Sequence, residues 1–165
     1  MRNAKRFDER ITIGSVPDTE DLEQLKEIGY KTVIDLREED EKFGGKVEKK
    51  ATAMGLRYLS IPVRRAGIKM EDVARFYDAI YEKGSAPIYA FSRFGKKPLA
   101  FLLLFEGVAR KESHLIPNLI RKAAKFGLNL EGDIVLQEFL VEVLNSGEVK
   151  PIIDSIREHR PDLFS

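Results

Sequence analysis

The segment 88–98, with the sequence IYAFSRFGKKP, places polar, cationic and glycine residues between two apolar stretches. Its pattern predicts a short strand over Ile88–Phe91, a tight loop, and a long apolar helix that begins at Pro98. Such a loop directs backbone N–H groups and the positive end of a helix dipole toward one point, which attracts anions, and phosphate above all. The sequence therefore predicts an anion-binding site formed by Ser92, Arg93, Phe94, Gly95, Lys96 and Lys97.

The composition limits what this site can serve. The chain has 165 residues, of which 43% are hydrophobic and 33% charged, as is typical of one globular domain. A formal net charge of +1 gives no general attraction to nucleic acid or to an anionic membrane, so any cationic function must be local. The absence of cysteine excludes disulfides and thiolate chemistry. Because the N-terminus is polar and no apolar run reaches the length of a membrane span, we expect a cytoplasmic protein without a membrane partner. Abundant Lys and Glu without cysteine or tryptophan also suit a heat-adapted organism.

Strand and helix patterns alternate along the first two thirds of the chain. Besides Ile88–Phe91, apolar runs predict strands at Ile11–Ile13, Thr32–Leu36 and Leu56–Val63. Helical patterns follow Asp18, precede Gly55, and cover Val73–Tyr81, while the charged segment from Glu38 to Lys50 is expected to be a surface loop. From His114 onward every pattern is helical, with helices expected near Pro117, Ile134 and Pro151.

This order predicts an α/β fold with a mostly parallel central sheet of about four to five strands flanked by helices. We expect a single domain over residues 1–165, with a helical C-terminal half that extends over about 114–165. Ligands of such folds gather at the carboxyl ends of the strands, and the loop Ser92–Lys97 follows one of these ends.

Several segments resemble the cysteine-phosphatase superfamily in the expected order. The most similar branch is the beta-lactamase-hydrolase-like protein-phosphatase-like family, which is related to dual-specificity phosphatases. The resemblance extends from about residue 8 to residue 140, and it implies a phosphatase-like fold. The matching segments are Ile13–Pro17, Thr32–Arg37, Gly55–Val63, Pro87–Gly95 and Ala123–Gly127.

The family signature is Cys-x4-Arg or Cys-x5-Arg followed by Ser or Thr. The resemblance implies a thiolate nucleophile, an arginine that clamps the phosphoryl oxygens, a hydroxyl that assists the leaving thiolate, and an aspartate that protonates the leaving oxygen. In this sequence Ser92 stands at the cysteine position, Lys97 at the arginine position, and Pro98 at the hydroxyl position. Arg64 and Arg65 stand where the acid is expected. Ser92 and Lys97 are thus vestiges of a catalytic pair, and every matched chemical role is altered.

A serine hydroxyl cannot be deprotonated at neutral pH by the loop alone, and no histidine is near in sequence. The loop amides, Gly95 and the cations Arg93, Lys96 and Lys97 still suit an anion, with Arg64, Arg65 and Lys69 as further cations. We therefore expect a pseudophosphatase that binds a phosphate-bearing or other anionic ligand, such as a phosphoprotein, with little or no turnover. No metal and no cofactor are expected, and the oligomeric state is left open.

Other functions are compatible with the same residues. Ser92 is compatible with a residual protein-tyrosine or dual-specificity phosphohydrolase, and with an engineered replacement of cysteine. The helical C-terminal half is compatible with a protein-interaction module. Nucleotide hydrolysis is disfavoured because the loop lacks the first glycine and the hydroxyl of a Walker loop, and nucleic-acid binding because no basic stripe is interleaved with aromatic residues.

Structural roles are alternatives for the same side chains. Ser92 suits a turn residue that caps the next helix, and Lys96 and Lys97 suit solvated charges. Arg64 and Arg65 could pair with Glu71, Asp72 or the acidic segment Glu38–Glu41. Asp35 and Arg37 are expected to fix strand ends, and His114 and His159 to lie at helix ends.

Overall fold

The computed structural model describes residues 4–64, 70–145 and 150–164. The chain divides into two compact units, of which the first comprises Met1–Val63 and Ala79–Pro98, and the second Arg64–Asp78 and Leu99–Ser165. The expectation of one domain with a helical extension stays a prediction. Helices α3 (Met70–Tyr81) and α4 (Lys96–Ala109) contribute residues to both units. Within the described residues, no helix has the length and apolar character that crossing a membrane requires.

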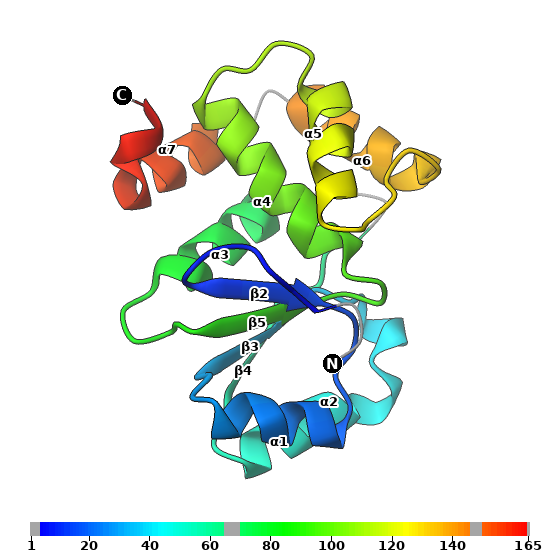
Figure 1. Cartoon of the computed structure of the whole chain (residues 1–165), viewed down its shortest axis with the longest axis vertical. Helices are drawn as coiled ribbons and strands as arrows, with labels where there is room; N and C mark the ends of the chain where they lie inside the picture. The colour runs from blue at the N-terminus through cyan, green and yellow to red at the C-terminus, as the bar shows by residue number, and fades with distance from the viewer. Residues whose placement is uncertain (1–3, 65–69, 146–149, 165) are drawn as a thin grey trace. The chain divides into compact units, whose positions relative to one another are not determined.

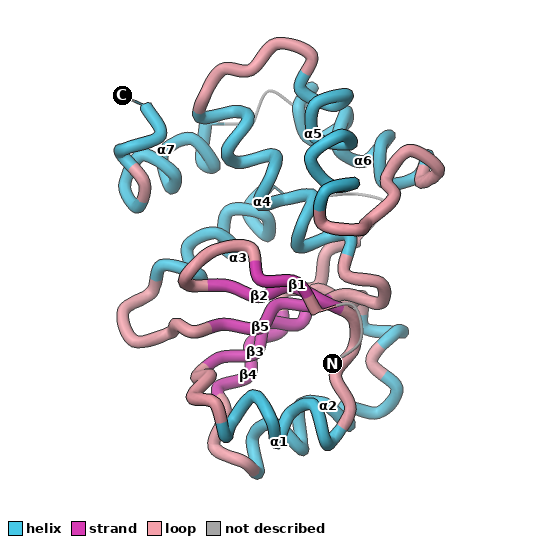
Figure 2. Tube along the Cα trace, in the orientation of Figure 1, coloured by secondary structure: helices cyan, strands magenta, loops and turns pink. Residues whose placement is uncertain are grey.

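The first unit contains a five-stranded sheet in the order β1-β2-β5-β3-β4 (Figure 2). Strands β2, β5, β3 and β4 are parallel, and β1 pairs antiparallel with β2. This confirms the predicted α/β fold with a mostly parallel sheet. The bounds are Lys5–Arg6 for β1, Ile11–Gly14 for β2, Thr32–Asp35 for β3, Arg57–Ser60 for β4 and Ile88–Phe91 for β5.

Two helices, α1 (Thr19–Glu27) and α2 (Lys46–Ala53), lie against one face of this sheet (Figure 1). Asp18 caps α1, because its carboxylate accepts the N–H of Asp21 at 2.8 Å while Asp21 accepts the N–H of Asp18 at 3.0 Å. Leu22 and Leu25 from α1 join Val33 and Tyr89 of the sheet in a buried apolar cluster. Burial of these apolar side chains stabilises the sheet, and the loop after β5 extends from that sheet.

The second unit is helical. Besides its parts of α3 and α4 it contains α5 (Leu115–Lys125), α6 (Ile134–Asn145), α7 (Lys150–His159) and the 3₁₀ turn η3 (Pro161–Phe164). The rings of Tyr77 and Phe105 meet edge to face, with 4.7 Å between their centroids. Asp78 accepts a hydrogen bond from the Ser155 hydroxyl at 2.7 Å and lies 3.2 Å from the His159 ring nitrogen Nε2, which links α3 to α7.

The predicted start of one helix was wrong. Helix α4 begins at Lys96 rather than at Pro98. Helix α5 begins at Leu115, so Pro117 lies in its first turn, close to the predicted position. Each proline is the third residue of its helix. Backbone N–H groups in the first turn have no acceptor within the helix, so a proline, which lacks an N–H, loses no hydrogen bond there. Proline therefore marks the first turn of a helix and not its first residue. The charged segment from Glu38 contains two 3₁₀ turns, η1 (Glu39–Glu41) and η2 (Phe43–Gly45), before α2 begins.

Candidate anion-binding loop

The loop Ser92–Gly95 connects the carboxyl end of β5 to the first turn of α4. The last residue of β5, Phe91, lies in register with Gly14 of β2 and with Asp35 of β3. Three parallel strands therefore end together at this edge of the sheet, as expected for a ligand site in an α/β fold. The order of strand, glycine-containing loop and helix that the sequence predicted is confirmed.

Ser92 organises the loop from within. Its residue surface is only 4% exposed, and its N–H donates to the Gly14 carbonyl at 3.4 Å. Its hydroxyl oxygen Oγ accepts the N–H of Gly95 at 3.1 Å. One of the loop amides is thus already paired with the side chain at the nucleophile position.

Two features of the backbone favour glycine at position 95. Its φ of +78° is a left-handed conformation that favours glycine. A Cβ atom at this position would lie 3.1 Å from both the carbonyl carbon and the oxygen of Gly14. The close approach of two backbone segments, one after β5 and one at the end of β2, fixes the curvature of the loop.

Arg93 and Phe94 form the exposed tip of the loop, and Phe94 is 54% exposed. Their backbone N–H groups find no acceptor among the described residues. The Arg93 guanidinium carbon lies 5.1 Å from the centroid of the Phe94 ring, a cation–π contact. Two unpaired amides beside a solvent-exposed cation constitute the part of the loop best suited to receive an anion.

The cations at the start of α4 differ in their surroundings. Lys96 is half-buried, whereas Lys97 is 8% exposed and its ammonium Nζ donates to the Val63 carbonyl at 2.8 Å. One of the three donors of Lys97 is therefore used on the segment that follows β4. Arg64 is exposed and belongs to the other compact unit, while Arg65 and Lys69 lie outside the described residues.

A buried ion pair occupies the neighbouring strand end. Asp35 is fully buried, and its carboxylate accepts from Arg37 Nε at 3.0 Å and from Arg37 Nη2 at 2.9 Å. Burial lowers the pKa of Arg37, but the hydrogen bonds and charge of Asp35 outweigh this and raise it overall. Arg37 also donates to the Glu41 carbonyl at 3.1 Å, so the pair holds the turn after β3 in place. This is the structural role expected for Asp35 and Arg37.

Tyr58 completes this group and was missed from the sequence. Its hydroxyl donates to Asp35 Oδ2 at 2.5 Å, and its pKa is raised first by burial and then by the hydrogen bond to Asp35. No local pattern could have identified it, because the contact depends on Tyr58 standing on β4 beside β3. The fork of Arg37 is thereby used within the fold rather than offered to a ligand.

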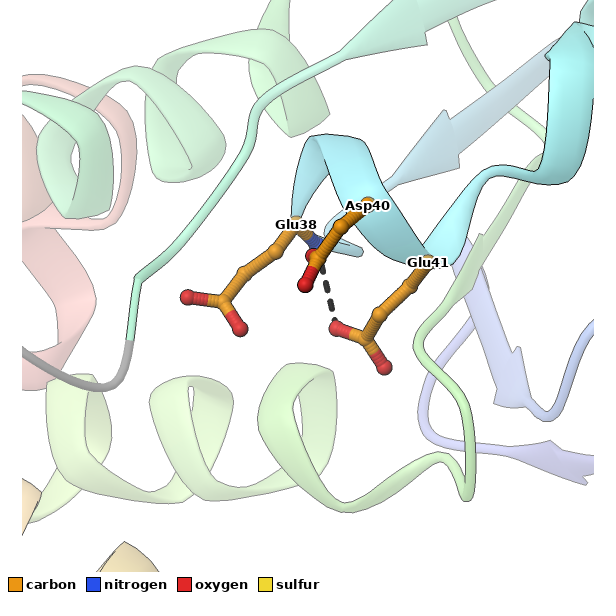
Figure 3. Close-up of side chains that lie close together, drawn as sticks. All are labelled: Glu38, Asp40 and Glu41. Atoms are coloured by element: carbon orange, nitrogen blue, oxygen red, sulfur yellow. Dashed lines mark hydrogen bonds between the residues drawn. The ribbon is translucent and has the colours of Figure 1, made fainter.

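Three carboxylates gather on the turn after β3, where the side chains of Glu38, Asp40 and Glu41 place their oxygens within 4.8 Å of one another. Figure 3 shows that the Glu41 carboxylate turns back to the Glu38 backbone N–H, which donates to it at 3.2 Å. Clusters of this kind on protein surfaces are common without a bound ion, so the group carries no metal assignment.

Two of the carboxylates that were expected near Arg64 and Arg65, Glu39 and Asp72, each pair with a lysine or arginine of their own unit. Glu39 pairs with Lys42 at 2.9 Å, and Lys42 also donates to the Ser60 hydroxyl. Asp72, in the second unit, pairs with Arg75 at 3.4 Å. The pairing of Arg64 and Arg65 with Glu71, Asp72 or the segment Glu38–Glu41 stays a prediction.

Comparisons with known proteins identify relatives of this chain and of its fold. The family described as DSP-PTPase phosphatase fused to NAD+ kinase matches residues 2–99. The beta-lactamase hydrolase-like protein of Agrobacterium fabrum is 31% identical over 109 residues, which is 64% of this chain and 25% of that protein. The chain thus spans about a quarter of the length of that curated relative.

Two solved structures share the fold. A putative phosphatase from Shewanella putrefaciens CN-32 superposes with a TM-score of 0.66 at 19% identity and covers 91% of each chain. TpbA of P. aeruginosa, in complex with phosphotyrosine, gives a TM-score of 0.66 at 13% identity over 93% of this chain and 90% of its own. By its fold and by the match to residues 2–99, the chain belongs to the family of DSP-PTPase phosphatases fused to NAD+ kinase, within the cysteine-phosphatase-like superfamily.

Proposed function

We propose that the loop Ser92–Lys97 binds a phosphate-bearing or other anionic ligand with little or no turnover, so that the protein acts as a pseudophosphatase. The observation that carries this proposal is the pair of amides at Arg93 and Phe94, which have no acceptor in the described part of the chain and lie next to an exposed guanidinium. Donors that are neither paired nor deeply buried gain most from an anion that accepts from several of them at once.

The absence of turnover follows from the residues in the reactive positions. The Ser92 hydroxyl has a far higher pKa than a thiol, and its oxygen already accepts the Gly95 amide. Lys97 lacks the bidentate fork of arginine, and one of its donors is used on Val63. Pro98 offers neither an N–H nor a hydroxyl, and the residues after β4 bring cations where an acid would be required.

A phosphoprotein is the ligand class that we favour. TpbA, which shares the fold, has been crystallised in complex with phosphotyrosine, and this supports a phosphate-bearing ligand for this chain. Arg93, Lys96, Lys97, Gly95, Phe94 and Ser92 remain the proposed contacts, with Arg64 and Arg65 as proposed contributors from outside the loop.

Thermal denaturation in phosphate, vanadate and tungstate tests the binding proposal. A ligand at about 100 times its Kd adds about 2.7 kcal/mol to the free energy of unfolding, so a clear rise in Tm is expected. Replacing Arg93 and Lys96 by glutamine should reduce the rise, whereas Lys83→Gln, which removes an exposed charge elsewhere in the same unit, should leave it unchanged. A Tm that no oxyanion changes would contradict the proposal.

A second experiment tests turnover. Ser92→Cys alone should not produce fast hydrolysis of phosphate esters, because the arginine and the acid are also replaced. Robust hydrolysis by that variant would show that another residue supplies the acid. Hydrolysis by the unmodified protein that is lost in Ser92→Ala and kept in Ser113→Ala would instead support a residual phosphohydrolase.

A further inference from the structure

A pocket of about 250 Å³ lies in the first unit at the amino ends of β2 and β5, the edge of the sheet opposite the arrowheads in Figure 1. The loop Ser92–Lys97 lies at the carboxyl ends, so the two features occupy opposite edges of the same sheet. Segments from the β1–β2 turn, the start of β2, the α1–β3 connection and Pro87 line the pocket. Its volume is below the roughly 300–1,000 Å³ of sites for drug-sized molecules, so the pocket suits a small molecule with about one ring.

Two arginines, Arg6 and Arg10, supply the positive charge of this pocket. Arg10 is held rigidly, since its Nε and Nη2 donate to the Ile80 carbonyl at 3.2 and 2.8 Å and its guanidinium lies 5.2 Å from the Tyr81 ring centroid. Arg6 uses only its Nε, on the Asp8 carbonyl at 3.2 Å. Within the described part of the chain neither guanidinium forms an ion pair, so each retains N–H donors and its charge for a ligand.

Two acidic residues, Asp8 and Glu9, also line the pocket and limit how much negative charge a bound ligand can carry. Asp8 Oδ1 accepts the backbone N–H groups of Arg10 and Ile11 at 2.8 and 3.0 Å, so it shapes the β1–β2 turn. Glu9 is exposed on the same turn and also lines the pocket. Two acidic and two basic side chains make a dianion such as phosphate unfavourable, whereas a monoanionic carboxylate meets one guanidinium fork with less repulsion.

The other lining residues provide a pair of hydroxyl groups and an apolar surface beside them. The hydroxyls of Thr12 and Tyr30 lie 2.6 Å apart and share one hydrogen bond, which leaves one of their two O–H hydrogens for another acceptor. Ile28 is 67% exposed at the rim, and a bound ring would cover part of its apolar surface. Tyr30 and Pro87 extend this apolar surface.

We propose that this pocket binds a small monocarboxylate with an aromatic or apolar body, with its carboxylate toward Arg6 and Arg10 and a polar substituent toward the Thr12–Tyr30 hydroxyl pair. The site is independent of the anion loop, because it differs in position, residues and preferred charge. A small carboxylic acid bound in this pocket would therefore not compete with an anion bound at the loop Ser92–Lys97.

The test uses 4-hydroxybenzoate as the probe and backbone amide NMR of the whole chain as the readout. Saturable shifts at Thr12 and Tyr30, with a Kd of about 1 mM, are expected. The uncharged analogue 4-hydroxybenzamide should bind at least about tenfold more weakly, since it lacks the charge-assisted hydrogen bonds. Equal affinity for the two probes, or no saturable shift at these amides, overturns the proposal.

Matched variants localise the effect. Arg6→Gln and Tyr30→Phe should each weaken 4-hydroxybenzoate by about three- to tenfold, whereas Lys5→Gln, the neighbouring exposed cation on β1, should not. Unchanged affinity in Arg6→Gln overturns the assignment.

Inorganic phosphate serves as a second probe. It should shift the amide signals of Arg93 and Phe94 but not those of Thr12 and Tyr30. A stronger shift of Thr12 and Tyr30 by phosphate than by the carboxylate overturns the proposed ligand class.

Discussion

Two neighbouring strand ends at one edge of the sheet use their polar groups in opposite ways. After β3, the carboxylate of Asp35 is buried and satisfied by Arg37 and Tyr58. After β5, the amides of Arg93 and Phe94 are exposed at the loop tip and find no acceptor among the described residues. A charge enclosed by its partners contributes to the stability of the fold, whereas donors left without partners are available to a ligand. Variants of the two sites should therefore separate stability from binding.

The largest effect is expected at the enclosed charge. Asp35→Asn leaves the Arg37 guanidinium buried without its counter-ion, which should lower the free energy of unfolding by about 3–5 kcal/mol in urea denaturation. The comparison variant is Arg75→Gln, which breaks an exposed pair with Asp72 and should cost no more than about 1 kcal/mol. Similar losses in both variants would show that the Asp35 group is no more structural than a surface pair.

Gly95→Ala should have the next largest effect, a loss of about 2–3 kcal/mol, because it adds a Cβ in a left-handed conformation and brings it against Gly14. Gly29→Ala provides the control for backbone strain alone, since its φ is +99° and nothing lies within 4 Å of its added Cβ. It should cost about 1–2 kcal/mol. The excess in Gly95→Ala measures the contact between the loop and β2, and equal losses would argue against that contact.

Ser92→Ala tests the inside of the loop. The Gly95 amide loses its acceptor, so the free energy of unfolding should fall by about 1 kcal/mol, while Ser113→Ala should have no measurable effect. Oxyanion binding should persist in Ser92→Ala because the Arg93 and Phe94 amides are retained. Complete loss of binding in this variant would move the essential contact from the tip of the loop to its interior.

The smallest effect concerns pH. Burial and the hydrogen bond to Asp35 raise the pKa of Tyr58 above its ordinary value of about 10. As the pH rises above about 10, the unfolded chain releases this proton while the folded chain keeps it, so stability falls. The fall should be shallower in Tyr58→Phe than in the unmodified protein when the free energy of unfolding is followed from pH 8 to about pH 11. Identical slopes would show that the Tyr58 hydroxyl is not held by Asp35.

The sequence was a good guide where neighbouring residues decide the outcome. A helix was predicted to start at Asp18 or Thr19, and Asp18 caps α1 through its reciprocal hydrogen bonds with Asp21, three residues away. The strand Ile88–Phe91 has the predicted bounds because its apolar run is flanked by breakers on both sides. The strand β1 at Lys5–Arg6 was missed, since two exposed cationic residues have no strand pattern and pair only because Ile11–Gly14 lies beside them.

The candidate site divides in the same way. Its position after a buried strand and before a helix was determined by the sequence alone, because the spacing of apolar residues and the left-handed preference of glycine act locally. The tertiary structure alone decided that Lys97 reaches Val63, that Tyr58 joins Asp35, and that Arg6 and Arg10 meet Thr12 and Tyr30 around one pocket. These contacts depend on which strands become neighbours and in what register, and that choice is made by burial of the whole sheet rather than by any segment of the chain.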